Sequence, residues 1–274
     1  MLNVRVLTVV DLHQSRLHYR SLVLGVEEQH PDVVAIVGDA LEAFSSPGKY
    51  RFTADECAGI LAGLPVTHLV FTRGNHEDSN WTNFVYAWPH DQRPLIGLYG
   101  SYLGAGPLGI IGFPCMTGDE STWCEHLPLR TEPMEIYTPE HRKPLPSDTN
   151  MWLPLLIRSF PASRCLWLMH EPPIGLPLAR EGVWCPAWTE AVARWSPCVT
   201  VSGHDHDSPI DNRMWHTKLG ETVCINVGQS ENELHYAVLD FEFESEAVPL
   251  PAKITIKAFP WDQQLIVDRP NGMS

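Results

Sequence analysis

Five short apolar runs of this sequence each end in a cluster of polar side chains, and this recurrence constrains the fold more than any other feature. The run at residues 66–71 leads into Thr72-Arg73-Gly74-Asn75-His76-Glu77. Glycine lets the backbone turn sharply, and polar side chains just past a buried strand lie where open α/β sheets bind their ligands. The other four clusters are Asp11-Leu12-His13, Gly38-Asp39, His170-Glu171 and Gly203-His204-Asp205-His206. The sequence therefore predicts an α/β protein with a reactive sheet edge.

The N-terminal part alternates between short β-branched runs and segments with apolar side chains at helical spacing. We predict strands at residues 4–10, 33–37 and 68–71, and helices at residues 14–29 and 53–64. Thr53 and Glu56 form a capping-box pattern at the start of the second helix. Because right-handed crossovers return parallel strands to one sheet, we expect Asp11, Asp39 and Asn75 at one edge.

The C-terminal part predicts a second sheet. Gly104-Ala105-Gly106-Pro107 separates two apolar runs and is typical of a hairpin turn. We predict strands at residues 99–103, 108–113, 164–169, 199–201, 222–227, 235–243 and 253–259, with helices at 150–160 and 184–195. The last three strands have no helix between them and are expected to be antiparallel. Two sheets packed face to face would enclose one core between outer helices, and 274 residues suit one domain.

Residues 115–149 form a Pro-rich stretch with little periodicity. It is longer than the roughly 12 to 15 residues beyond which loops are usually functional or disordered. We interpret it as a lid or specificity insert within the single domain. It contains a basic cluster that suits a phosphate, although a solvated surface loop fits equally well: His126, Arg130, His141, Arg142 and Lys143.

The composition limits the partners. A formal net charge of −14 argues against nucleic acid, because neutralising phosphates needs many Lys or Arg contacts, and it favours a small substrate. The seven cysteines are scattered and predict neither a disulfide framework nor a zinc ribbon. No stretch approaches the ~20 apolar residues of a membrane span. Residues 2–10 carry Arg5 and lack a cleavage site, so we expect a cytoplasmic protein without membrane contact.

The side chains that follow the strands form a mixed oxygen and nitrogen donor set. Such a set suits Mn, Fe, Zn or Co better than Ca or Mg. A close pair of ions needs a bridging carboxylate, and such a pair can clamp a phosphoryl group while activating a water. Asp39 is the lone carboxylate of its motif and is therefore the natural bridge.

In this order the five motifs resemble the signature of the calcineurin-like metallophosphoesterases. The resemblance covers residues 11–206 and implies a four-layer α/β/β/α sandwich of two packed mixed sheets flanked by helices, with two divalent metals, Mn being the first expectation. It implies that Asp11, His13, Asp39 and His206 bind one metal, and that Asp39, Asn75, His170 and His204 bind the other. His76 would contact the phosphate or the leaving group.

One motif departs from that of the Ser/Thr protein phosphatases in this superfamily. They carry Gly-Asp-x-x-Asp-Arg-Gly, whereas this chain has Gly38-Asp39-Ala40-Leu41-Glu42-Ala43-Phe44, so their phosphate-binding arginine is missing at this position. Glu42 stands where their aspartate orients the catalytic histidine; it would either do the same for His76 or be a surface carboxylate. A small phosphomonoester or phosphodiester is therefore the expected substrate.

Two other functions remain open at this stage. The fold also serves as a noncatalytic scaffold, as in the retromer scaffold subunit, and the superfamily includes nucleases. Every ligand position of the motif set is filled here, which favours an enzyme, because function is argued from the site. The acidic charge disfavours a nuclease. The substrate, the metal pair and the oligomeric state are not predicted.

Overall fold

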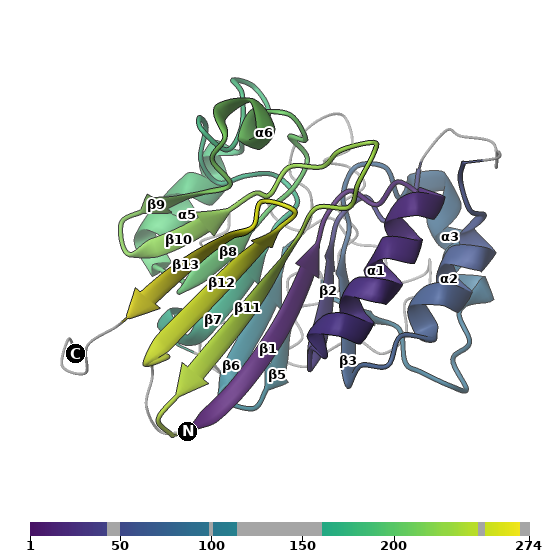
Figure 1. Cartoon of the computed structure of the whole chain (residues 1–274), viewed down its shortest axis with the longest axis horizontal. Helices are drawn as coiled ribbons and strands as arrows, with labels where there is room; N and C mark the ends of the chain where they lie inside the picture. The colour runs from purple at the N-terminus through teal and green to yellow at the C-terminus, as the bar shows by residue number, and fades with distance from the viewer. Residues whose placement is uncertain (43–49, 99–100, 114–160, 246–249, 269–274) are drawn as a thin grey trace.

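The computed structural model describes residues 1–42, 50–98, 101–113, 161–245 and 250–268 (Figure 1). The predicted insert at 115–149 and the predicted helix at 150–160 lie outside these residues. Two mixed sheets dominate the described chain. The structure thus has the predicted pair of packed sheets.

The first sheet has seven strands, and its parallel half is N-terminal. Its order is β13-β12-β11-β1-β2-β3-β4, with β1 at Leu2–Val9, β2 at Val33–Val37, β3 at His68–Thr72, β4 at Ile96–Gly97, β11 at Tyr236–Phe243, β12 at Lys253–Phe259 and β13 at Gln263–Asp268. β1 to β4 run parallel, whereas β11, β12 and β13 are antiparallel to their neighbours. The polar motifs after β1, β2 and β3 therefore meet at one edge.

The second sheet has six strands with a parallel centre. Its order is β5-β6-β7-β8-β10-β9, with β5 at Ser101–Ala105, β6 at Leu108–Gly112, β7 at Cys165–Leu168, β8 at Val199–Val201, β9 at His216–Leu219 and β10 at Thr222–Ile225. The predicted hairpin is present, because β5 and β6 pair antiparallel. The motifs after β7 and β8 likewise share an edge, since these strands are parallel neighbours.

Helices cover the outer face of each sheet. α1 (Arg16–Gln29), α2 (Ala54–Ala62) and α3 (Asp78–Ala87) lie together beside the first sheet, and α5 (Pro186–Trp195) lies on the opposite side near β9 and β10 (Figure 1). The predicted capping box is present, since Thr53 Oγ1 accepts from Glu56 N and Glu56 Oε2 accepts from Thr53 N. The short α6 (Ser208–Asn212) follows the last motif. No helix in the described residues is long and apolar enough to cross a membrane.

Three apolar layers separate the helices and sheets. Alternate residues of β1 illustrate them: Leu7 and Val9 pack under α1 and α2, whereas Val6 faces the second sheet. The layer between the sheets includes Ile110 and Leu239, both fully buried. The third layer joins the outer face of the second sheet to α5. This period-two alternation is how a sheet covered on both faces buries all its side chains.

The prediction that the last three strands are antiparallel is only partly correct. β11 and β12 are antiparallel, but β10 joins the second sheet and runs parallel to β8, with Val223 opposite Val199. The reason is that the chain passes from β8 through α6 to the edge strand β9 and then turns back, so that β10 lies between β8 and β9. Neither α6 nor β9 was predicted. α3, β4 and β13 were also not predicted. β13 is an edge strand with no fully buried side chain, so its apolar pattern is weak.

Removing volume between the sheets should destabilise the fold. We expect Leu239→Ala to lower the free energy of unfolding by about 2 to 5 kcal/mol, because a cavity would remain in a closed layer. Leu24→Ala removes the same atoms from the exposed side of α1, where the leucine is 65% accessible, and should change it by less than about 0.5 kcal/mol. Denaturant titration measures both values. Equal losses would contradict the place of Leu239 between the sheets.

Candidate metal centre

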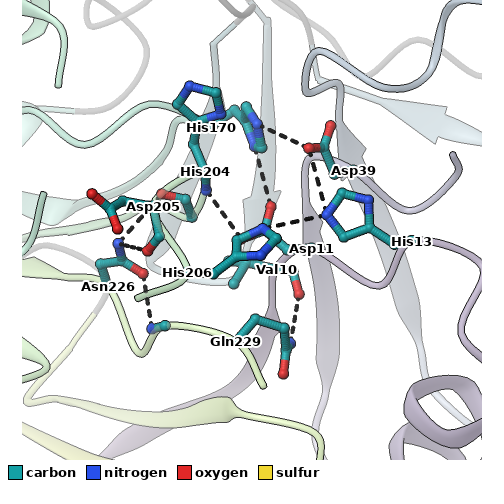
Figure 2. Close-up of polar contacts among 12 residues, drawn as sticks. Val10, Asp11, His13, Asp39, His170, His204, Asp205, His206, Asn226 and Gln229 are labelled. Carbon is teal, nitrogen blue, oxygen red and sulfur yellow. Dashed lines mark hydrogen bonds and ion pairs between the residues drawn. The ribbon is translucent and has the colours of Figure 1, made fainter. Parts of the chain in front are cut away.

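The predicted ligands gather where strands of both sheets end. Asp11 and His13 follow β1, Asp39 follows β2 and Asn75 follows β3, all in the first sheet. The second sheet contributes the three remaining histidines after β7 and β8: His170, His204 and His206. Figure 2 shows Asp11, His13, Asp39, His170 and His206 directed toward a common centre, with His204 beside His170. The two sheets therefore supply complementary halves of one donor set.

One group of donor atoms lies around Asp11. His13 Nε2 and His206 Nε2 are 3.3 Å apart, and His206 Nε2 lies 3.6 Å from Asp11 Oδ2. Atoms that ligate one metal at about 2.1 Å lie about 3.0 to 3.4 Å from each other. The three side chains thus have nearly the spacing of a coordination shell.

A second group surrounds His170. Its Nε2 lies 2.9 Å from Asn75 Oδ1 and 3.3 Å from Asp39 Oδ2. Asp39 Oδ2 is also 3.9 Å from His13 Nε2, so this carboxylate lies between the two groups. The ring of His204 is 4.9 Å from that of His170, measured between centroids. The arrangement has the form of two adjoining sites that share Asp39.

Buried negative charge makes the donor set suitable for cations. Asp11 is fully buried, and its Oδ1 has no hydrogen-bond partner among the described residues. A buried carboxylate oxygen without a partner is unfavourable unless a cation lies nearby. Burial lowers the pKa of His170, but Asp39 opposes this and raises that pKa to about 10. Burial raises the pKa of Asp39, yet the charge of His170 brings it below its ordinary value. The site favours positive charge, and a divalent cation can replace these protons.

Several candidate ligands have strained backbones. The φ angles of Asp11, His13, Asp39 and His204 are 53°, 45°, 49° and 65°, in the left-handed region that non-glycine residues rarely adopt. Such strain is kept where the surrounding structure forces it, and it gathers at functional sites. The turns after β1, β2 and β8 are therefore shaped by the positions of these side chains.

Two motif glycines are required by close packing. Gly38 has a φ of 80°, and a Cβ there would collide with the imidazole of His170. A Cβ on Gly74 would collide with the carboxylate of Asp39. Each glycine thus makes room for a candidate ligand that belongs to another motif.

Glu77 has a positioning role that the sequence did not reveal. It is 1% exposed, and its carboxylate accepts hydrogen bonds from the backbone N–H groups of Asp39 (3.1 Å), Leu41 (3.1 Å) and Gly74 (2.7 Å). Burial and the charge of Asp39 raise the pKa of Glu77 to about 7. Glu77 therefore fastens the turn after β2 to the turn after β3. Its place directly after Asn75 and His76 was the available signal.

Asp205 and Asn226 hold the turn that carries the last two histidines. Asp205 lies between them, is fully buried, and accepts from Ser208 N at 2.9 Å and Arg180 N at 2.8 Å. Asn226 Nδ2 donates to the carbonyls of Gly203 (3.3 Å) and Asp205 (2.9 Å), as Figure 2 shows. A buried amide of this kind leaves no recognisable pattern in the sequence.

Glu42 lies at the site and is not a surface carboxylate. Its Oε1 is 2.6 Å from His76 Nδ1, and its Oε2 is 3.2 Å from His13 Nδ1. The close contact with His13 is the main cause that lowers the pKa of Glu42 to about 2, against the opposing effect of burial. His76 is also fixed through its backbone, since its N–H donates to Asp39 Oδ1 at 2.9 Å. Glu42 thus links His76 to a candidate metal ligand.

A family model described as calcineurin-like phosphoesterase matches residues 4–208. A comparison with curated protein sequences finds no match.

Solved structures share the fold. A dimetal phosphatase from Danio rerio is similar with a TM-score of 0.59 and 11% identity, over 97% of this chain and 98% of that chain. GAP50, the anchor in the inner membrane complex of Plasmodium, has a TM-score of 0.54 and 8% identity over 99% and 90% of the two chains. A protein of Thermus thermophilus has a TM-score of 0.53 and 12% identity over 97% and 99%. The predicted α/β/β/α fold is confirmed, and these low identities show the fold alone.

Removing the Glu77 carboxylate should loosen the turns around Asp39. We expect Glu77→Ala to lower the free energy of unfolding by about 3 kcal/mol or more, because three backbone N–H groups lose their acceptor. Glu27→Ala on the exposed face of α1 is the matched control and should have little effect. Thermal and denaturant unfolding of both variants, with metal content per chain, measure the difference. A Glu77 variant as stable as the control would disprove the fastening role.

Proposed function

The chain belongs to the calcineurin-like phosphoesterase family, and on that premise we propose that it hydrolyses a phosphoester bond of a small substrate with two divalent metal ions. The observation that carries this proposal is the shared position of Asp39 between two groups of donor atoms. A single metal would need only one of these groups. Two groups joined by one carboxylate are what a binuclear site requires.

We propose one ligand set for each ion. Asp11, His13, Asp39 and His206 would hold the first, and Asp39, Asn75, His170 and His204 the second. The mixed oxygen and nitrogen donors suit Mn, Fe, Zn or Co, with Mn the first choice. The other ring nitrogen of two of these imidazoles contacts the protein: His13 Nδ1 faces Glu42, and His170 Nδ1 lies 3.4 Å from the carbonyl oxygen of Val37. Such contacts fix which ring nitrogen is available to a metal.

The proposed chemistry is attack of hydroxide on phosphorus. When bound, the two ions would supply the nucleophile and neutralise charge on the phosphoryl group. The chain holds the donors in place beforehand through Glu77, Asp205 and Asn226. Because these supports are buried, little reorganisation is needed when the substrate binds.

His76 is proposed to act on the substrate. One of its ring nitrogens lies within 4.8 Å of ligand atoms of His13 and Asp39, and its side chain is 33% exposed. Its Nδ1 contacts Glu42, so Nε2 is the nitrogen that remains for a substrate oxygen. Donating a proton to the leaving group at this position is worth roughly 10²- to 10⁴-fold in rate.

The completeness of the donor set favours an enzyme over a noncatalytic scaffold, and the net charge of −14 disfavours a nuclease. The proposal covers both monoesters and diesters as substrates. The cytoplasmic location and the specificity role of residues 115–149 remain predictions from the sequence.

Metal loading and hydrolysis test the proposal. Protein loaded with Mn should contain two ions per chain and hydrolyse members of a panel of aryl phosphomonoesters, phosphodiesters and nucleotides. Asp39→Asn should lose both ions, because the shared ligand serves both groups, whereas His170→Ala should lose mainly one. Elemental analysis of each variant gives the ratio.

Asp207→Asn is the matched control, since this aspartate follows His206 but is 70% exposed. It should keep both ions and full activity. Two tightly held ions in Asp39→Asn would remove the bridging role. Failure of the loaded wild-type protein to hydrolyse any panel member would instead remove the enzymatic proposal.

His76→Asn should separate substrates by leaving group. Hydrolysis of alkyl phosphates should fall far more, by roughly 10² or greater, than hydrolysis of p-nitrophenyl phosphate, whose phenolate leaves with little help. Metal content and fold should persist. Steady-state rates on both substrates measure the contrast. Equal losses would leave phosphate positioning as the role of His76, and loss of an ion would make it a ligand.

A further inference from the structure

An arginine from a separate segment contacts the carboxylate that supports His76. Arg51 Nη1 lies 3.2 Å from Glu42 Oε2, the same oxygen that faces His13 Nδ1. Glu42 is 14% exposed, and the side chain of Arg51 is 38% exposed. The guanidinium therefore contacts the same carboxylate that contacts His13 and His76, and it is open to solvent.

The backbone of this segment is fastened to the turn that carries His13. Residues 50–52 lie against residues 14–16 through an antiparallel bridge between Ser15 and Arg51. Gln14 Nε2 donates to Phe52 O at 2.9 Å, and Phe52 N donates to Gln14 O at 2.8 Å. Arg16 Nε donates to Arg51 O at 3.1 Å. Arg51 is thus held beside Ser15, two residues after the candidate metal ligand His13.

Two other arginines near the site are engaged differently. Arg73 precedes Gly74 but is 7% exposed, and its guanidinium lies over the ring of Trp81 at 5.4 Å. Arg180 contacts Asp205 at 4.0 Å and Asp207 at 3.8 Å. Arg51 is the one of these three that combines solvent access with contact to Glu42.

We propose that Arg51 binds a phosphoryl oxygen of the substrate. A guanidinium has five N–H donors, so the contact with Glu42 leaves donors for a second anion, and its planar fork suits phosphate. A substrate anion approaching a chain of net charge −14 needs local positive charge of this kind. The inference rests on the proposed function and names a residue that would bind its substrate.

The test uses the full chain loaded with Mn and two probes, inorganic phosphate and p-nitrophenyl phosphate. Arg51→Gln should raise the dissociation constant of phosphate, measured by calorimetry, and KM for the ester by about 10- to 100-fold, the effect of one lost charge-assisted hydrogen bond. Metal content should not change. Arg51→Lys keeps the charge without the fork and should weaken phosphate binding less. Arg20→Gln, on the exposed face of α1, should change neither constant.

The outcomes separate the inference from the function. Unchanged phosphate affinity in the Arg51 variants would overturn the proposed role of Arg51. Loss of metal, or a fall in kcat at constant KM, would also overturn it, because either result would mean that the substitution acts through His13 or His76. If Arg51→Gln fails to fold, Arg51→Lys decides the matter, because its phosphate affinity must still fall severalfold. If the loaded wild-type protein neither binds phosphate nor hydrolyses the ester, the proposed function is wrong and the role of Arg51 falls with it.

Discussion

The rest of the centre depends on one buried carboxylate placed between two groups of donors. Asp39 can approach both His13 and His170 only because its turn adopts a left-handed φ and because Gly74 leaves room for its oxygens. A buried carboxylate is costly unless it is hydrogen-bonded or paired with positive charge. Asp39 receives one hydrogen bond from His76 N and faces the ring of His170. The surrounding turns are arranged to satisfy this single charge.

The turns of the centre are held by carboxylates that contact protein groups and are not assigned to a metal. Glu77 binds backbone N–H groups, Glu42 binds imidazoles and Arg51, and Asp205 binds a helix start. Each of these carboxylates is engaged by its own protein partners, and we assign none of them as a metal ligand. This division explains how an acidic chain can place many carboxylates near one centre without all of them competing for the same cations.

The sequence predicted the edge of the sheets better than their outer parts. Buried runs such as residues 33–37 are strongly apolar, and glycine with polar residues marks each turn, so the positions of Asp11, Asp39 and Asn75 follow from parallel crossovers. β13 and β9 were not predicted, because half-buried edge strands carry a weak pattern. The roles of Glu77 and Asn226 were also not predicted, because they depend on backbone atoms brought close only by the fold. The contact between Arg51 and Glu42 was not predicted either, because only the fold brings these two side chains together.

The donors come from two different sheets, and this has a consequence for the stability of the whole protein. The sheets face each other through an apolar layer, and the hydrophobic attraction across it is non-directional. An ion bound by His170 and Asp39 together would act as a clamp between the layers. The affinity of the protein for this ion and its free energy of unfolding would then be linked. Each tenfold rise in free metal concentration above the dissociation constant would add about 1.4 kcal/mol to the free energy of unfolding. Metal supply in the cell would thereby control how long each molecule survives proteolysis as well as how fast it works.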